Sequence, residues 1–190
     1  MADQKIRSFL AIQLDDPLTK EINNFVTKIQ PRFSQFRFVP PTNWHLTLHF
    51  FGSISAGELN LLRRTLPQTI SKIESFSVSI KGLGGFPNDR KSRILWIGVE
   101  KGSERLVFLK KILDQNLSQI KFPLETKSYH PHITIARSQK LVNCSILDSE
   151  KWMMFNTQSK IEKISLFQSN LTPSGPKHTI LENFHLVPSK

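Results

Sequence analysis

The chain opens with an apolar run followed by apolar residues at helical spacing. Residues 6–14 (IRSFLAIQL) end at an Asp-Asp-Pro triplet, which predicts a buried strand that leads into a helix. Asp16 is a candidate for the helix N-cap, and Pro17 suits the first helical turn. The apolar residues that follow predict an amphipathic helix that covers a sheet and ends before Pro31. They are Leu18, Ile22, Phe25, Val26 and Ile29.

The next part of the chain predicts two strands and a second helix. Residues 36–39 and 45–51 read as strands on either side of a Pro-Pro-Thr-Asn turn, and Gly52 is expected to close the second strand. Ser55 and Glu58 have the spacing of a capping box, and leucines at helical intervals follow them. A second helix is therefore expected to begin at this point.

The rest of the chain supplies more strands and a third helix. Strands are expected at 76–83, 94–99, 130–137, 160–168 and 179–187, with a helix from Ser103 between the second and third of these. A less periodic stretch that contains Trp152 runs from about residue 138 to 158. Strands and helices are interspersed without strict alternation. We therefore predict an α+β fold with largely antiparallel sheets.

Two of the predicted strands carry the same polar pattern. HLTLHF begins at His45, and HPHITIAR contains His132, so each strand has a His-x-Thr triplet. Residues i and i+2 of a strand point to the same side, so His45 shares a face with Thr47, and His132 shares one with Thr134. Two related halves that face each other would bring both pairs into one cleft.

Such paired triplets suit acid–base chemistry at a phosphorus atom. One histidine can take a proton from water while the other gives a proton to a leaving ribose oxygen. The hydroxyl groups of Thr47 and Thr134 can hold the non-bridging phosphate oxygens between them. A single His-x-Thr triplet is more often a surface or core feature than a catalytic one. Two copies, each within an apolar strand, favour a functional role. Neither triplet has a carboxylate in a ligand spacing such as HExxH, so neither a metal site nor a cofactor is predicted.

Other side chains near the triplets have less certain positions. On regular strands, His49 would share the face of His45, and His130 would share the face of His132; we expect both at the rim. Arg137 would point to the opposite face, so its use as a phosphate ligand requires a twist, a bulge or a strand end there. Four aromatic residues could stack on a nucleobase, although core or rim positions are the favoured interpretation. They are Phe50, Phe86, Tyr129 and Phe167.

Composition indicates a class of binding partner and a cellular compartment. The 190 residues, 38% of them apolar, suit one folded unit that spans residues 1–190. Lys and Arg outnumber Asp and Glu by 26 to 15, so RNA is the leading partner class, with a merely solvated surface as the alternative. The single cysteine, Cys144, suits a reducing cytosol. A signal peptide or a membrane-length apolar run is not apparent, so we expect a cytoplasmic protein that does not bind a membrane. We also expect a monomer without an obligate protein partner.

With these motifs in place, the chain resembles the 2H phosphoesterases, and within them the RNA 2',3'-cyclic phosphodiesterases, historically called 2'-5' RNA ligases. The likeness lies in RSFLAIQL, NWHLTLHFFG, GLGGFPNDRKSRILWIGVE, HPHITIAR and ISLFQSNLTPSGPKHTILENF. It implies two pseudo-symmetric lobes around a central cleft, with the helices on the outside. It also implies metal-independent hydrolysis of a ribose 2',3'-cyclic phosphate, on RNA or a nucleotide, to a 2'-phosphomonoester.

The resemblance also assigns roles to single positions. It implies that His45 donates a proton, that His132 accepts one, and that Thr47 and Thr134 bind the phosphate. His178 is a departure, since many relatives have a tyrosine at this position. Three other functions stay open at this point: joining RNA ends through a 2'-5' linkage at the same residues, RNA binding without catalysis, and hydrolysis of a small cyclic nucleotide phosphate.

Overall fold

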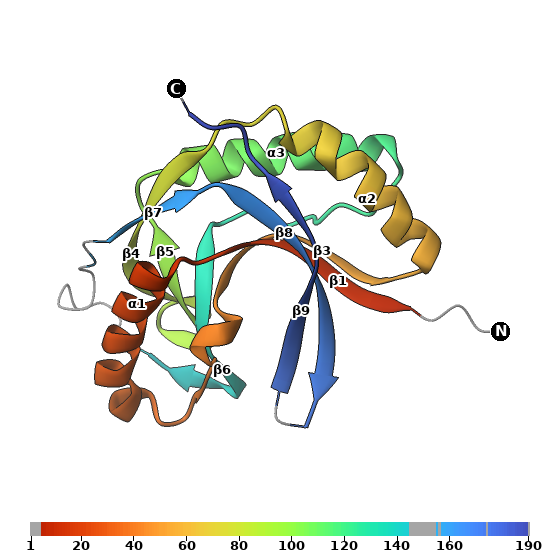
Figure 1. Cartoon of the computed structure of the whole chain (residues 1–190). Coiled ribbons are helices and arrows are strands. Elements are labelled where there is room, and N and C mark those ends of the chain that lie inside the picture. Colours follow the sequence, from red (N-terminus) through yellow and green to blue (C-terminus); the bar gives the residue numbers. More distant parts are fainter. Residues whose placement is uncertain (1–4, 145–154, 156, 174, 190) are drawn as a thin grey trace.

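Nine strands and three α-helices make up the part of the chain that the computed structural model describes, residues 5–144, 155, 157–173 and 175–189 (Figure 1). In chain order the elements are β1 (Ile6–Gln13), α1 (Asp16–Ile29), β2 (Arg37–Phe38), β3 (His45–Ile54), α2 (Ala56–Ile70), β4 (Phe76–Pro87), β5 (Lys91–Val99), α3 (Ser103–Gln119), β6 (His132–Asn143), β7 (Gln158–Ile161), β8 (Lys163–Thr172) and β9 (Gly175–His185). Short 3-10 turns occupy Gln30–Phe33 and Pro41–Asn43. Trp152 lies outside the described residues.

The strands form one curled antiparallel sheet with a motif strand on each side of its midline. The order is β7-β4-β5-β6-β3-β1-β8-β9, and β2 pairs with β6. One half consists of β3, β1, β8 and β9, and the other of β6, β5, β4 and β7. Between these two fully described motif strands the register has one pair, Leu46 opposite Ile133. The α+β prediction with antiparallel pairing is confirmed, and the two halves meet where the His-x-Thr triplets begin.

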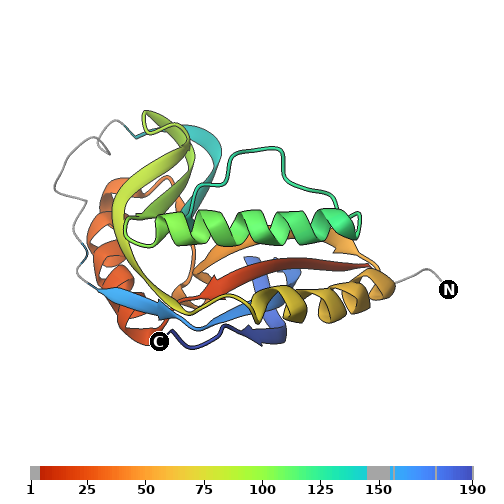
Figure 2. The same cartoon turned by 90° about the horizontal axis from the view of Figure 1, so that it is seen from above.

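Each half contributes a helix that packs on the other half. The α3 helix connects β5 to β6, yet its Asp114 contacts His49 of β3. The α1 helix connects β1 to the segment ahead of β3, yet its cap residue Asp15 accepts a hydrogen bond from Ser159 of β7 (2.6 Å). Figure 2 shows α2 and α3 side by side over the same part of the sheet. The helices therefore lie on the outside, as expected, and bind the two halves together.

Local signals placed the first residue of each α-helix to within one position. The capping box of α2 is present, with the Ser55 N–H donating to Glu58 (2.7 Å) and the Glu58 N–H donating to the Ser55 hydroxyl (3.2 Å). The expected cap of α1 is wrong by one residue. Asp15 holds the cap position because its backbone is extended, and its carboxylate accepts from the Leu18 N–H at 3.0 Å.

Several strand predictions also need correction. The structure extends three strands beyond their expected ends, since β4 continues to Pro87, β5 begins at Lys91 and β6 continues to Asn143, and it shifts β9 to Gly175–His185. Residues 160–168 form two strands instead of one, because β7 pairs with β4 while β8 pairs with β1 in the other half. The chain crosses between the halves at Glu162. Gly52 does not end its strand, since β3 continues to Ile54. Gly52 lies within β3 with a φ of +72°, where the register with β1 shifts.

The core lies between the helices and one face of the sheet, the face that carries the middle residue of each His-x-Thr triplet. Leu46 and Ile133 are both 0% exposed, and leucines and isoleucines of the three helices pack against this face. Burial of each such side chain contributes roughly 1.5–3 kcal/mol relative to exposure. The opposite face therefore remains for polar chemistry. Within the described residues, no helix combines the length and the apolar character needed to cross a membrane.

Candidate active site

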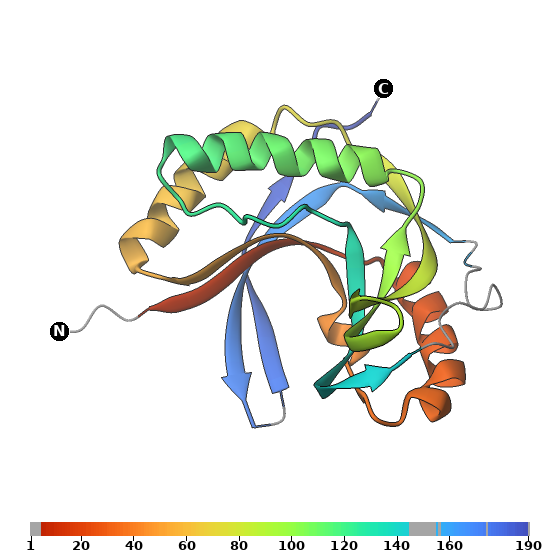
Figure 3. The same cartoon turned by 180° about the vertical axis from the view of Figure 1, so that it is seen from behind.

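A cleft of about 1740 Å³ lies over the junction of β3 and β6. The predicted histidines and threonines, His45, Thr47, His132 and Thr134, all line it, and so does Arg137. Further walls come from the start of β1, from β2 and from the β8–β9 hairpin, which stands beside the junction in Figure 3. The structure thus brings together all five residues that the sequence nominated.

A bulge in β6 turns Arg137 toward the cleft. Thr134 lies opposite Trp96 of β5 and Ala136 lies opposite Leu95, so β6 contains one extra residue, Ile135. Ile135 and Ala136 are both 0% exposed, and the alternation of faces resumes after them in the opposite phase. For Arg137 to bind phosphate, the sequence required a twist, a bulge or a strand end at this point, and the structure has a bulge there.

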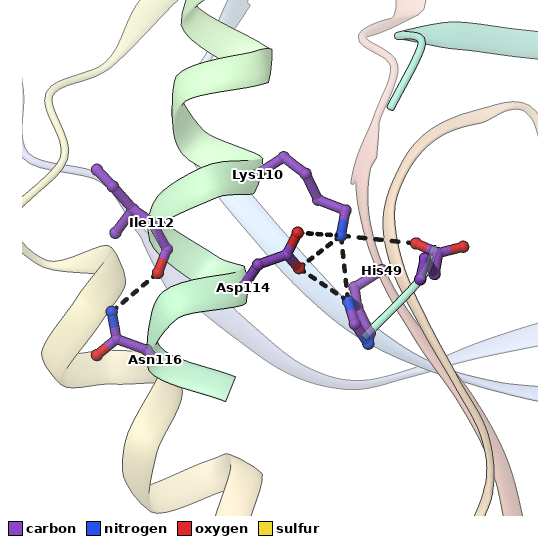
Figure 4. A network of polar contacts seen from close by, with 6 residues as sticks. His49, Lys110, Ile112, Asp114 and Asn116 are labelled. Carbon is purple, nitrogen blue, oxygen red and sulfur yellow. Dashed lines mark hydrogen bonds and ion pairs between the residues drawn. The ribbon is translucent and has the colours of Figure 1, made fainter. Parts of the chain in front are cut away.

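A matching bulge in β3 overturns the expectation for His49. Thr47 lies opposite Ala11 of β1 and His49 lies opposite Leu10, so Leu48 is the extra residue. His49 consequently points away from His45 and is 0% exposed behind the sheet, where its Nδ1 lies 3.3 Å from Asp114 (Figure 4). The next residue, Phe50, takes the cleft side with 49% of its surface exposed.

Each catalytic candidate is held by the carbonyl two residues before it. His45 Nδ1 donates to the carbonyl oxygen of Asn43, and His132 Nδ1 donates to that of His130, both at 2.7 Å. Because a carbonyl oxygen only accepts, these bonds place the hydrogen of each neutral ring on Nδ1. Nε2 of each ring is then the nitrogen free for a ligand. His130 itself is exposed and is not one of the residues that line the cleft, and its backbone carbonyl orients His132.

Burial makes both rings reluctant to take a proton. It lowers the pKa of His45 to about 4, against the opposing effect of the Asn43 carbonyl and with the help of the positive charges of His178, Arg137 and His132. Burial also lowers the pKa of His132, again opposed by the carbonyl that holds its ring. At neutral pH both imidazoles are therefore uncharged unless an anion lies beside them.

The cleft is lined by cations. Among the described residues around it there is no aspartate or glutamate. The positive side chains are Arg7, Arg37, Arg137, Lys140 and Lys177. Such a one-sided charge attracts phosphate groups and raises their local concentration. Part of the positive charge of the chain, which is +11 in total, is therefore concentrated at the cleft.

The sequence missed the part that His178 of β9 plays in this geometry. Its ring is perpendicular to that of His45, with centroids 5.5 Å apart, and both rings contact Phe9. Its Nδ1 is buried without a hydrogen-bond partner in the described part of the chain. Burial, followed by the charge of Arg137, lowers the pKa of His178. The only signal in the sequence was that the family resemblance implied a different residue at this position.

The β8–β9 hairpin is tied to the strand of His45. Nδ2 of Asn43 donates to the carbonyl oxygen of Pro176 at 2.8 Å, while the Asn43 carbonyl holds His45. The side chain of Asn43 thus bridges the two walls, and its backbone orients a histidine. In the sequence, Asn43 is only a polar residue in a proline-rich turn, and this did not predict its contacts with Pro176 and His45.

The four aromatic candidates fall into two groups. Phe50 and Phe86 line the cleft, and Phe86 contacts His132 at a ring distance of 5.0 Å. Phe167 is only 6% exposed and stacks on Phe9, and Tyr129 packs against the core. Phe50 and Phe86 are therefore the two of these rings that a nucleobase in the cleft could reach.

Comparison with known proteins places these features in context. Residues 12–96 match the family model "LigT like Phosphoesterase". The chain is 34% identical over 185 residues to the RNA 2',3'-cyclic phosphodiesterase of Methanothermobacter thermautotrophicus, covering 96% of this chain and 100% of the relative. The enzyme of the same name from Aquifex aeolicus is 32% identical over 88% of this chain and 93% of its own length.

A solved structure resembles the fold as a whole. The crystal structure of E. coli LigT in its apo form superposes with a TM-score of 0.81 at 23% identity, covering 97% of this chain and 99% of the other. E. coli LigT has also been crystallised with 3'-AMP, and this form superposes with a TM-score of 0.74 at 21% identity over 96% of this chain and 99% of the other.

Proposed function

Because the chain belongs to the LigT-like phosphoesterases and is an enzyme of the RNA 2',3'-cyclic phosphodiesterase family, we propose that it opens ribose 2',3'-cyclic phosphates without a metal ion. The product is the 2'-phosphomonoester, at the end of an RNA or on a nucleotide. The observation that carries this proposal is the convergence of two His-Thr pairs, with identically fixed rings, on one cationic cleft.

The phosphate binds between the two triplets. The hydroxyls of Thr47 and Thr134 donate to its non-bridging oxygens, and the guanidinium of Arg137 neutralises their charge. Phosphoryl transfer depends largely on such positioning and charge stabilisation. The complex of E. coli LigT with 3'-AMP supports a nucleotide phosphate as the ligand of this fold.

Two proton transfers accompany the bond changes. Nε2 of His132 takes a proton from water as the water oxygen attacks phosphorus. The bond between phosphorus and O3' breaks, and His45 gives its Nε2 proton to O3'. This sequence leaves the phosphate on O2', with His45 neutral and His132 protonated, and proton exchange with solvent restores the starting state.

The starting state requires a proton on His45, against the effect of burial. The negative charge of the bound cyclic phosphate favours the imidazolium form, because an opposite charge within about 4–6 Å raises the pKa of a histidine. Substrate binding therefore favours the protonated form of His45, which acts as the acid. Acid, base and cation all come from side chains, and in the described parts of the chain no three His, Cys, Asp or Glu residues are grouped to hold a metal ion.

The test is incubation with a nucleoside 2',3'-cyclic phosphate in excess EDTA, with the product identified by ³¹P NMR. We expect unimpaired turnover and a nucleoside 2'-phosphate. Absence of turnover, loss of turnover on chelation, or a 3'-phosphate product would overturn the proposal. A variant with both His45→Gln and His132→Gln, purified in the same way, controls for contaminating nucleases.

A further inference from the structure

A cluster of ionisable side chains lies behind β3, on the face opposite the cleft. This Lys110 cluster consists of His49, Lys110, Asp114 and Glu125 (Figure 4 shows the first three). Nζ of Lys110 lies 2.5 and 2.7 Å from the carboxylate oxygens of Asp114, 3.4 Å from Nδ1 of His49 and 3.6 Å from the Glu125 carboxylate. Lys110 is only 5% exposed and His49 is 0% exposed.

Core packing does not account for a lysine at this position. The buried face of α3 consists otherwise of leucines at 106, 109, 113 and 117. Taking an ammonium group out of water costs several kcal/mol, and its ion partners repay that cost only in part. A methionine at position 110 would fill the same space without this cost. The ammonium group of Lys110 instead adds directional polar contacts to its three neighbours in the cluster.

Those contacts join the two motif strands from behind. His49 belongs to β3, the strand of His45, whereas Glu125 lies in the segment that runs from α3 to His132 at the start of β6. Phe51 of β3 and Phe122 of the same segment add a ring contact at 5.6 Å. Direct pairing between β3 and β6 is limited to Leu46 and Ile133, so the sheet alone provides little restraint on their spacing.

We propose that Lys110 is a positioning residue, which ties the strand of His45 to the segment leading into His132 and so fixes the separation of the two imidazoles. This inference rests on the proposed hydrolysis, in which an acid and a base must reach the same phosphate from opposite sides. Catalysis of this kind is sensitive to geometry, and a displacement of about 1 Å can cost about 100-fold in rate. Lys110 acts on the reaction only through the two strands.

The experiment compares Lys110→Met with Lys110→Met/Asp114→Leu. The single variant leaves Asp114 and Glu125 without their cation, so we expect a lower Tm. The double variant replaces the Lys110–Asp114 ion pair by apolar side chains, which is often neutral or stabilising, so Tm should recover in part. Recovery is incomplete because Nδ1 of the buried His49 then lacks both of its partners. In both variants kcat should fall about 10-fold, with KM within about twofold, because substrate contacts remain but the alignment is lost. Lys81→Met, which removes the exposed Lys81–Glu100 ion pair (2.7 Å), is the matched control and should leave both constants unchanged.

A wild-type kcat in the double variant would reduce the cluster to a stability role and overturn the inference. A second readout is independent of turnover: NMR titration of the His45 and His132 rings. Their pKa values should change in the double variant, because their separation from each other and from Arg137 changes, and unchanged values would also overturn the inference. If the wild-type protein hydrolyses no cyclic phosphate, the proposed function fails on its own, and the titration still tests the positioning.

Discussion

Thr134 and Arg137 of β6 face the same cleft although their spacing would place them on opposite faces of a regular strand. The extra residue, Ile135, changes the phase of the strand between them. Leu48 does the same in β3, where Phe50 takes the position that corresponds to Arg137. The histidines and threonines of the cleft are thus symmetric, whereas a cation on one side faces an aromatic ring on the other. We expect this difference to orient a bound nucleotide.

Removal of the Arg137 guanidinium should weaken binding of the cyclic phosphate. Hydrogen bonds to a charged group contribute roughly 1.5–3 kcal/mol, so Arg137→Ala should lower kcat/KM by about 10- to 150-fold. Arg137→Lys should restore only part of this loss, since an ammonium cannot make two parallel bonds to phosphate. Steady-state kinetics would measure both effects, with the exposed Arg64→Ala on α2 as control. A fully active Arg137→Ala would remove this residue from the site.

Loss of either histidine should slow catalysis by about 100-fold or more, since that is the usual contribution of a general acid or base. The two roles can be separated with a substrate in which sulfur replaces the bridging O3', because a thiolate leaves without a proton. His45→Ala should recover activity on this substrate, whereas His132→Ala should not. Recovery in the His132 variant instead would reverse the assignment.

The pH dependence follows from the lowered pKa values. The reaction requires one protonated and one neutral imidazole, so kcat/KM should be bell-shaped with limbs at the two pKa values of the free enzyme. Burial holds the pKa of His45 at about 4 and that of His132 below its ordinary value of 6.5, so the maximum should lie below pH 6.5. The kcat profile should lie at higher pH, since the bound phosphate raises both pKa values. A kcat/KM maximum at pH 7 or above would contradict this account.

His178 should tune the acidity of its neighbour. Its positive charge is one of the contributions that lower the pKa of His45. His178→Phe keeps an aromatic ring against Phe9 and removes that charge, so the pKa of His45 should rise. Titration of the His45 ring by NMR would measure the change, and Tm should confirm that packing is retained. A lower or unchanged His45 pKa would contradict this electrostatic role of His178.

The cationic cleft should bind long RNA more strongly than a mononucleotide, in a salt-dependent way. Each phosphate contact releases counterions, so Lys140→Met or Lys177→Met should each reduce the slope of log affinity against log salt by about 0.7 for single-stranded RNA. Titrations of a catalytically inactive variant at several salt concentrations would give the slopes. Equal salt dependence for RNA and mononucleotide would mean that these lysines do not contact the strand.

Local sequence predicted the three helices and the approximate positions of most strands, and it nominated the catalytic candidates. Apolar periodicity depends on which face is buried, so it predicted the strands and the three helices. The same alternation paired His45 with Thr47 and His132 with Thr134, because residues two apart on a strand share a face over so short a distance. The capping box of α2 is equally local, since Ser55 and Glu58 bond to each other's backbone.

What only the tertiary structure decided depends on neighbouring strands and helices. A bulge exists relative to a partner strand, so the orientations of His49 and Arg137 could not be read from β3 or β6 alone. The contact between His178 and His45 joins β9 to β3, and the burial of Lys110 depends on α3 packing across the other half. Sequence thus determined which chemical groups the site could contain. The pairing of strands and the crossing of helices determined which of them face the cleft, because side-chain direction and burial depend on contacts between segments far apart in the chain.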